Sequence, residues 1–118
     1  NNIGLHATSV NELGFVYEKE NNPICIEYYE NAFQLFQQKN DLRNALNVLI
    51  NLTRYNIAHQ NYLESLNYLD QAFKLSEGHN FTSINIKLYY FQYEALKHLG
   101  RYKEANDALS NYTSVIRI

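Results

Sequence analysis

Apolar side chains recur three or four positions apart along most of this chain. Between positions 42 and 58 the apolar residues are Leu42, Ala45, Leu46, Leu49, Leu52, Tyr55 and Ile57. This spacing places them on one face of an α-helix, which turns once in about 3.6 residues. Five further stretches show the same pattern. The sequence therefore predicts six amphipathic helices, at Leu5–Lys19, Pro23–Gln38, Leu42–Ala58, Tyr62–Leu75, Ile84–Leu99 and Tyr102–Ile116.

Short polar segments separate the predicted helices and contain residues that suit helix ends. Pro23 fits a first helical turn because proline has no amide hydrogen to leave unpaired. Gly78 and Gly100 are placed to end two helices in the left-handed conformation that glycine tolerates. Thr82 or Ser83 is predicted to cap the helix that follows Gly78. Connections this short make consecutive helices antiparallel neighbours.

The composition agrees with one all-α domain. The 118 residues include four Gly and one Pro, too few for the turns of a many-stranded sheet, while a hydrophobic fraction of 46% can fill a core. A formal charge of −2 gives no field that would attract a phosphate backbone, so nucleic acid is not expected as a partner. No apolar run reaches the roughly 18 residues of a membrane helix, so no membrane contact is expected of this segment itself. A single Cys leaves the compartment open between cytoplasm and periplasm.

The chain also repeats itself. Residues 28–35 (YYENAFQL) align without a gap on residues 68–75 (YLDQAFKL), 40 positions further on. The two segments share a Tyr, an acid, an Ala-Phe pair and a final Leu. Residues 62–65 (YLES) align in the same way on residues 102–105 (YKEA). Since a fixed period indicates stacked structural repeats, the sequence predicts three helix pairs.

Two segments resemble the tetratricopeptide repeat (TPR) family. Residues 99–105 (LGRYKEA) resemble its Leu-Gly-x-Tyr-x-x-Ala turn, and residues 11–17 (NELGFVY) resemble its first helix. The resemblance implies antiparallel helix pairs stacked as a right-handed superhelix with a concave binding groove. The expected units are 5–40, 41–80 and 81–118 in a single domain, 1–118. Val115, Ile116 and Ile118 close the last helix without a polar cap, so a fragment of a longer protein is expected.

Small residues are expected to be buried where two helices approach closely: Gly14, Cys25, Ala32, Ser65, Ala72 and Ala105. The second unit departs from this pattern, because Thr53 stands where the first unit has Gly14. Asn56 likewise replaces a large apolar residue of the family. The second unit is therefore expected to be strained or hydrated. The period of about 40 exceeds the common TPR period of about 34. It resembles long variants in the sensor regions of bacterial signalling and transcription-regulatory proteins.

No catalytic constellation is visible. The four histidines, His6, His59, His79 and His98, lack the spacing that aligns two metal ligands on a helix. Cys25 has no His nearby in the sequence and is expected to be an inert buried thiol. The eleven tyrosines are expected to belong mainly to the core, with hydroxyl groups at its rim. Neither an enzyme activity, a cofactor nor a bound metal is expected.

The resemblance implies which face binds a partner, because the first helix of each TPR pair lines the groove. The residues expected there are Asn11, Phe15, Glu18, Asn47, Ile50, Asn51, Arg54, Ile57, Lys87, Tyr90, Phe91, Glu94 and Lys97. We therefore expect a non-catalytic module that binds a protein or peptide segment, as the sensor or scaffold part of a bacterial regulatory protein. One alternative is a structural spacer or a self-associating chain, for example a homodimer through the C-terminal helix. Another is a helical accessory region of an enzyme whose catalytic part lies elsewhere.

Overall fold

The computed structural model describes residues 2–117, and these residues form six α-helices joined by short turns. The helices are α1 (Asn2–Lys19), α2 (Cys25–Gln38), α3 (Leu42–Ala58), α4 (Tyr62–Ser76), α5 (Thr82–His98) and α6 (Tyr102–Ile116). The all-α prediction is thus confirmed, and each predicted helix is present with its ends shifted by three residues or fewer. Ile118, which the sequence places at the apolar C-terminal end, lies outside the described residues.

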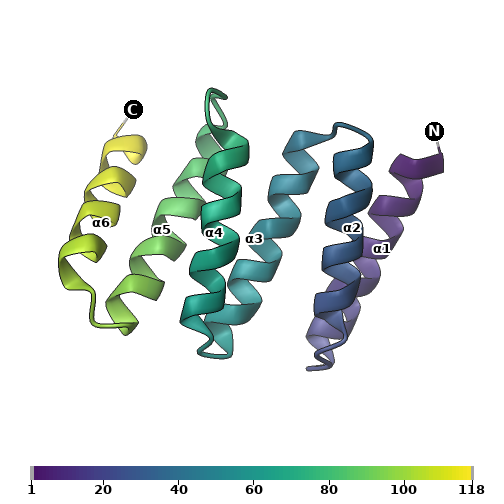
Figure 1. Cartoon of the computed structure of the whole chain (residues 1–118), viewed down its shortest axis with the longest axis horizontal. Helices are drawn as coiled ribbons and strands as arrows, with labels where there is room; N and C mark the ends of the chain where they lie inside the picture. The colour runs from purple at the N-terminus through teal and green to yellow at the C-terminus, as the bar shows by residue number, and fades with distance from the viewer. Residues whose placement is uncertain (1, 118) are drawn as a thin grey trace.

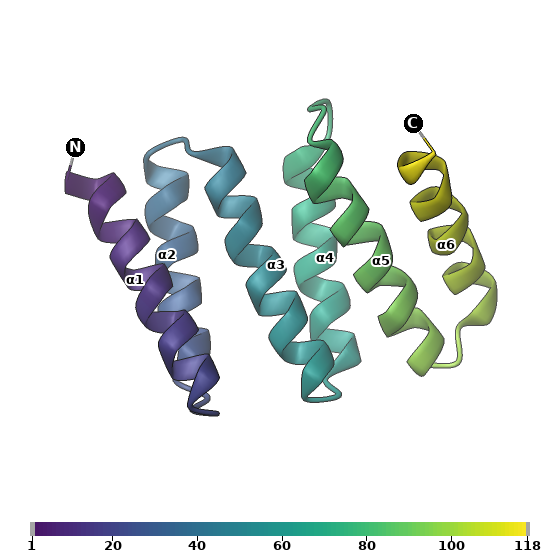
Figure 2. The same cartoon turned by 180° about the vertical axis from the view of Figure 1, so that it is seen from behind.

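The helices pack as consecutive antiparallel pairs, α1 with α2, α3 with α4 and α5 with α6. Helices α2 and α4 lie nearer the viewer in Figure 1, whereas Figure 2 shows α1, α3 and α5 from the opposite side. Successive pairs contact each other through α2 and α3, and again through α4 and α5. The result is an elongated body of 44 × 32 × 19 Å, with α1 at one end and α6 at the other (Figure 1).

The core runs along this stack and is densest around α3. That helix buries residues on several sides, including Leu46, Leu49 and Leu52, because α2, α4 and α5 all pack against it. All six small residues that the sequence analysis placed between helices are buried, as expected: Gly14, Cys25, Ala32, Ser65, Ala72 and Ala105. Small side chains there allow the close backbone approach on which the helix pairs depend.

The turns follow the predicted chemistry in part. Gly78 and Gly100 have φ angles of 80° and 77°, as predicted for glycines that end helices. Asn21 and Gln60 adopt a similar left-handed conformation at the ends of α1 and α3, so glycine was not needed there. These residues and Gly100 mark equivalent places in the three pairs. The position in α1 that matches a given residue of α3 therefore lies 39 residues earlier, and α3 and α5 are offset by 40.

Two predicted helix starts are wrong. Pro23 lies in the turn before α2, which begins only at Cys25, because the segment 20–24 forms two successive turns instead of continuing the helix. Neither Thr82 nor Ser83 caps α5; Thr82 is its first helical residue, and Phe81 occupies the cap position without a side-chain bond. The α5 start is instead held by the backbone bond from Asn85 N to Phe81 O, at 2.8 Å.

The polar residues buried in the second pair all find partners. Asn56 Nδ2 donates to Leu52 O at 2.8 Å, and Thr53 Oγ1 donates to Leu49 O at 2.8 Å. Within residues 2–117, no fully buried side-chain nitrogen or oxygen lacks a hydrogen bond. The buried amide and hydroxyl thus have protein partners, because both side chains bond to carbonyl groups one turn earlier in their own helix.

Candidate protein-binding site

A chain of polar contacts links α1, α2 and α3 across the face that the resemblance assigned to binding. Arg54 on α3 donates from Nη2 to Glu18 Oε1 on α1 at 2.7 Å and from Nη1 to Asn51 Oδ1 at 2.9 Å. Asn51 Nδ2 donates to Asn11 Oδ1 on α1 at 3.3 Å. From α2, the buried Tyr29 hydroxyl donates to Glu18 Oε1 at 2.5 Å. The structure thus brings four of the predicted residues into direct contact.

The burial of this network is uneven. The Glu18 side chain is only 15% exposed, whereas that of Arg54 is 38% exposed. A carboxylate this enclosed needs charged or hydrogen-bonding partners, and Arg54 and Tyr29 supply them. The Arg54 guanidinium has five N–H donors, of which two are used in these bonds. Arg54 is therefore held in place by the fold while part of its donor capacity faces solvent.

A group of aromatic rings covers the other end of this face, where α5 meets α6. The Tyr90 ring centroid lies 6.2 Å from that of Phe91, 6.4 Å from that of Tyr93 and 5.6 Å from that of Tyr112. Tyr90 is the most exposed of these rings, at 43%. The other rings support it from the side, so Tyr90 offers a fixed apolar surface at small cost in side-chain entropy.

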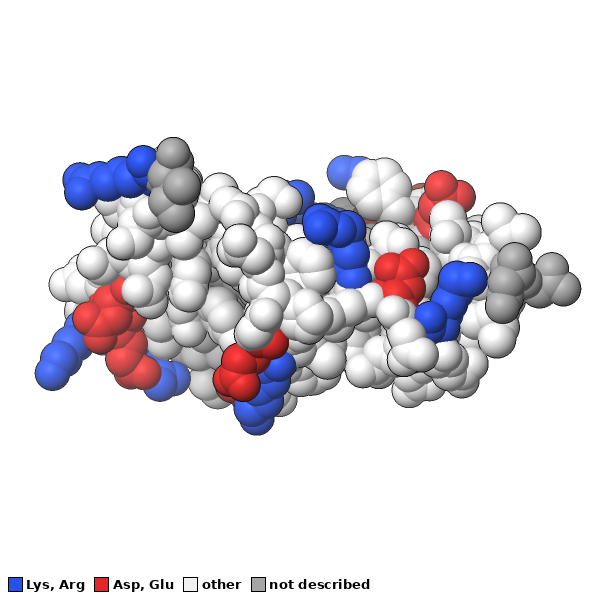
Figure 3. All heavy atoms as spheres, turned by 90° about the horizontal axis from the view of Figure 1, so that it is seen from above, with Lys and Arg blue, Asp and Glu red and all other residues white. Residues whose placement is uncertain are grey.

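Charged residues of α5 border this aromatic group. Lys97 Nζ lies 3.5 Å from Glu94 Oε2 and 5.0 Å from the centroid of the Tyr93 ring. The negative charge of Glu94 raises the pKa of Lys97. Lys97 thus keeps its positive charge beside the ring group. Figure 3 shows acidic and basic side chains interspersed over the surface seen from above, without a broad region of one sign.

The other residues predicted to line the binding groove differ in solvent exposure. Phe15 and Lys87 are exposed, and Asn47 and Ile57 are partly exposed. Ile50 is buried in the core at 5% exposure and has no surface to offer a ligand. The TPR pattern assigns positions from backbone register alone, whereas burial at Ile50 depends on how closely the neighbouring helices pack against α3.

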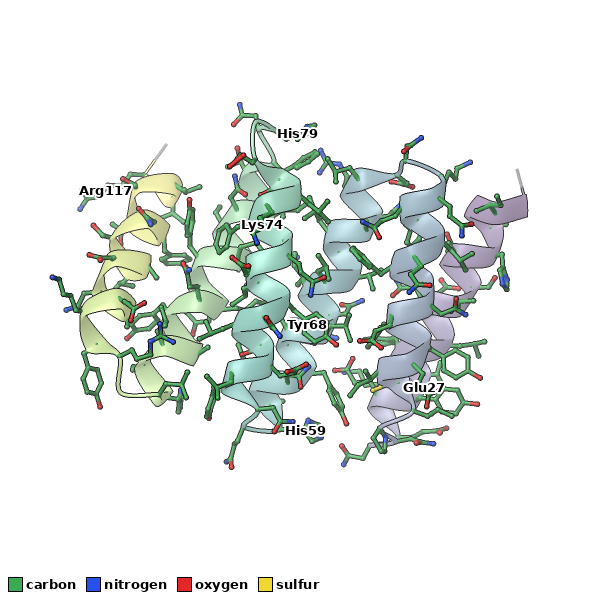
Figure 4. All side chains as sticks on the ribbon, viewed as in Figure 1. Glu27, His59, Tyr68, Lys74, His79 and Arg117 are labelled. Carbon is green, nitrogen blue, oxygen red and sulfur yellow. The ribbon has the colours of Figure 1, made fainter. Side chains whose placement is uncertain are left out.

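The sequence analysis missed two residues of these contact networks and a cleft on the opposite side of the molecule. Tyr29 and Tyr112 belong to the contacts above although both lie on second helices, which the TPR pattern does not assign to the groove. On the opposite side, the Tyr68 hydroxyl points from α4 to α2 and donates to Glu30 Oε2 at 2.7 Å (Figure 4). This bond closes part of a shallow cleft between α2 and α4, whose floor includes Leu49 and Leu52. No local sequence signal predicts such pairings, because their partners lie in different helix pairs.

Cys25 lies beside this network but is poorly suited to covalent chemistry. Its side chain is fully buried. Burial raises the pKa of the thiol, and the nearby Glu18 charge raises it further, although a hydrogen bond with Tyr55 acts in the opposite direction. A thiol that stays protonated and enclosed is a weak nucleophile. The position instead serves packing between α2 and α3.

The histidines lie apart from one another. His59 and His79 lie on turns at the lower and upper edges of the molecule in Figure 4, and His98 stacks on Tyr62 with ring centroids 4.7 Å apart. In the described part of the chain, no cluster of three or more His, Cys, Asp or Glu side chains could hold a metal ion. Among residues 2–117, no helix combines the length and the apolar character needed to cross a membrane.

The Tyr29 hydroxyl bond predicts a loss of stability at alkaline pH. Burial, followed by the bond to Glu18, raises the pKa of Tyr29 well above its ordinary value of 10.0. The folded state then binds the phenol proton more tightly than the unfolded state, so this contribution is complete below about pH 10 and declines as pH rises toward the folded pKa. Urea unfolding between pH 8 and 11.5 should show a shallower decline in Tyr29→Phe than in the native chain. Parallel curves would contradict this assignment.

The fold and the site together define a class of protein. Three antiparallel helix pairs, with polar and aromatic side chains on the face formed by α1, α3 and α5, describe a TPR-like helical-repeat module. A family model for SNAP, the soluble NSF attachment protein, matches residues 2–116, and the chain belongs to this family. SNAP proteins are protein-binding, non-catalytic adaptors, which confirms the expectation that the chain is not an enzyme. No curated protein and no solved structure matches the chain.

Proposed function

We propose that this chain is an adaptor that binds a protein segment on the face formed by α1, α3 and α5. The observation that carries the proposal is the fixed position of the half-exposed Arg54, which Glu18 and Asn51 hold from two helices. Arginine and tyrosine are the residues that most often dominate protein interfaces when they are exposed yet held rigid. Arg54 and the supported Tyr90 ring meet that description on the same face.

These two anchors indicate the chemistry of the bound segment. The free donors of Arg54 suit a carboxylate or a backbone carbonyl of the partner, and Tyr90 suits an apolar side chain. Lys87, three residues before Tyr90, and Lys97, over the neighbouring Tyr93 ring, favour an acidic residue beside that apolar side chain. A segment that alternates acidic and apolar residues therefore fits the face best.

The family description supplies the first partner to test, since a SNAP is by name an attachment protein for NSF. We propose that this chain likewise attaches NSF to a second protein. The role in a bacterial sensor that the TPR resemblance suggested has no further observation in its favour, because the family match points to attachment proteins instead.

Binding to purified NSF, immobilised for biolayer interferometry, tests this proposal. Tyr90→Ala and Arg54→Lys should each weaken binding by tenfold or more, about 1.4 kcal/mol, while the thermal melting curve stays close to that of the native chain. Arg54→Lys keeps the charge and the ion pair with Glu18 but loses the planar set of donors.

The matched control is Lys74→Ala on α4, which lies on the opposite face (Figure 4) and is exposed. It should leave the affinity unchanged. Native-like affinity in both Tyr90→Ala and Arg54→Lys would reject this face as the binding surface. A parallel fall in melting temperature and affinity would mean that the two side chains stabilise the fold and do not contact NSF.

A further inference from the structure

The shallow cleft between α2 and α4 is one part of a longer groove on the side of the molecule that faces the viewer in Figure 1. Both helices pack on α3, which forms the floor between them. The groove is therefore bordered by helices on both sides. It lies opposite to the face formed by α1, α3 and α5, so the two surfaces can each bind a different protein.

The groove contains two hollows in line, each with a volume of about 310 Å³. Glu30 and Tyr68 border the first hollow from α2 and α4. Leu42 and Leu75 border the second, which lies toward the C-terminal ends of α2 and α4. Because Gln37 lines both hollows, they are adjacent and form one continuous groove. We call it the α2–α4 groove.

The length of the groove suits a short extended segment. Its two hollows extend along α2 from Glu30 to Asn40. Ten residues of helix advance about 15 Å. An extended chain advances about 3.3 Å per residue, so a segment of about five residues covers this distance. The first and fifth side chains of such a segment point the same way and can both enter the groove.

Side-chain amides line the groove between its two ends. They belong to Gln34, Gln37 and Gln71. Within residues 2–117, none of these three side chains bonds to another residue. A glutamine amide has two donor hydrogens and an acceptor oxygen, so it can pair with the N–H and C=O groups of an extended backbone. The middle of the groove thus fits a peptide backbone of any sequence.

The end of the groove at Tyr68 is acidic. The Tyr68 hydroxyl donates to Glu30 Oε2 at 2.7 Å, and Glu64 lies one turn before Tyr68 on the same side of α4. Burial, followed by the bond to Glu30 and the charges of Glu30 and Glu64, raises the pKa of Tyr68, so both carboxylates lie near its hydroxyl. Neither carboxylate forms an ion pair with any residue that the structure describes.

No described basic residue lines either hollow. The basic side chains at the upper end of the groove point elsewhere. The end of Lys39 lies beside Gly4 of α1, and Arg43 lies 4.8 Å from the centroid of the Phe81 ring. The negative charge of the groove is therefore not balanced from within the chain, and a positive group of another molecule would complement it.

The equivalent positions between α4 and α6 differ in both respects. Asp70 is the counterpart of Glu30, but Lys74 Nζ lies 3.1 Å from its carboxylate and balances its charge. Ala108 stands where the first groove has Tyr68. The acidic end is thus specific to the α2–α4 groove and is not a general property of the repeat.

We propose that the α2–α4 groove binds an extended basic segment of a partner protein. An arginine of the segment pairs with Glu30 and Glu64, because its planar set of donors can serve both carboxylates. An apolar side chain four residues away packs on the half-buried Leu42 and Leu75. This preference for a basic segment is opposite to that of the Arg54 face, so the proposal does not depend on binding to NSF.

Nuclear magnetic resonance titration of the ¹⁵N-labelled chain tests this proposal. The probes are the capped peptide Gly-Arg-Ser-Thr-Ser-Leu-Gly and its reversed sequence, since the groove does not fix the direction of the segment. At least one of them should bind saturably with a dissociation constant of about 1 mM or lower. It should shift the side-chain amide signals of Gln34, Gln37 and Gln71. The same peptide with Glu in place of Arg should not bind.

Matched substitutions test the acidic end. The double variant Glu30→Gln with Glu64→Gln should weaken binding by about tenfold, because two ion pairs are lost. Asp70→Asn removes a carboxylate at the equivalent position of the next repeat and should leave the affinity unchanged. Circular dichroism confirms that each variant is folded. If the double variant has lost its fold, Glu64→Gln alone replaces it, since no hydrogen bond within residues 2–117 involves the Glu64 side chain.

Four results would contradict the proposal. Absence of saturable binding by both peptides means that the groove does not hold this kind of segment. Shifts confined to the surroundings of Arg54 and Tyr90 mean that the peptide binds the opposite face. Equal weakening by Asp70→Asn and by the double variant means that the acidic chain attracts the peptide without a defined site. Native-like affinity in the double variant means that Glu30 and Glu64 do not bind the arginine.

Discussion

Replacing Leu46 by alanine is expected to lower the free energy of unfolding by about 2–5 kcal/mol, the range for deleting a fully buried leucine side chain. Leu46 has no exposed surface and lies on α3, which packs against α2, α4 and α5 and so contacts a helix of every pair. A cavity there cannot be filled by a terminal helix that shifts, because both sides of α3 are constrained. In a stack whose repeats contact only their neighbours, damage at the centre also uncouples the two ends.

Urea denaturation followed by circular dichroism measures this effect. Leu63→Ala is the matched control, because Leu63 carries the same side chain on α4 but is 69% exposed. It should change the unfolding free energy by less than about 0.5 kcal/mol. A broadened or two-step transition in Leu46→Ala would show that the pairs have begun to unfold separately. Equal effects of the two substitutions would mean that α3 is not the centre of the core.

Replacing Gly14 by leucine is expected to lower the unfolding free energy by about 3 kcal/mol or more, since it forces side-chain atoms into a filled space. A Cβ atom at Gly14 would lie 2.9 Å from two ring carbons of Tyr29. The ring cannot easily move away, because it is fully buried and its hydroxyl is bonded to Glu18. The substitution therefore separates α1 from α2 and disturbs the Glu18 network at the same time.

Gly4→Ala on the same helix is the control for helix propensity. A Cβ atom there meets only the flexible end of the Lys39 side chain, at 2.9 Å, so Gly4→Ala should raise stability by about 0.5 kcal/mol. Thermal and urea unfolding measure both variants. Adding Gly14→Leu to a Tyr29→Ala background should cost much less than adding it to the native chain, because the obstructing ring is gone. An equal cost in both backgrounds would show that Tyr29 is not the obstacle.

Most of the fold could be predicted from the sequence, because helices and short turns depend on residues close together in the chain. Apolar spacing located all six helices, and Gly78 and Gly100 marked helix ends through a backbone conformation that glycine tolerates. The two wrong helix starts, at Pro23 and Thr82, also involve only residues close together in the chain. Several turn geometries fit the same few residues, and the packing of neighbouring helices selects among them.

The candidate site could be predicted from the sequence only in part. The TPR pattern selected Arg54, Asn51, Asn11 and Glu18, which the structure brings into contact, although their hydrogen bonds could not be read from it. Ile50 fell on the expected face by register but is buried in the structure. Tyr29 and Tyr112 were missed because they reach the face from second helices.

The sequence by itself determined the helical class, the number of helices, the pairing of helices and the small residues at which they approach. These properties depend on periodicity and on side-chain size, which each repeat carries in its own residues. The tertiary structure alone decided that Glu18 joins Arg54 and Tyr29, that Tyr68 reaches Glu30, and that Ile50 is buried. Those facts depend on distances between separate helices, and the packing of the whole stack sets them.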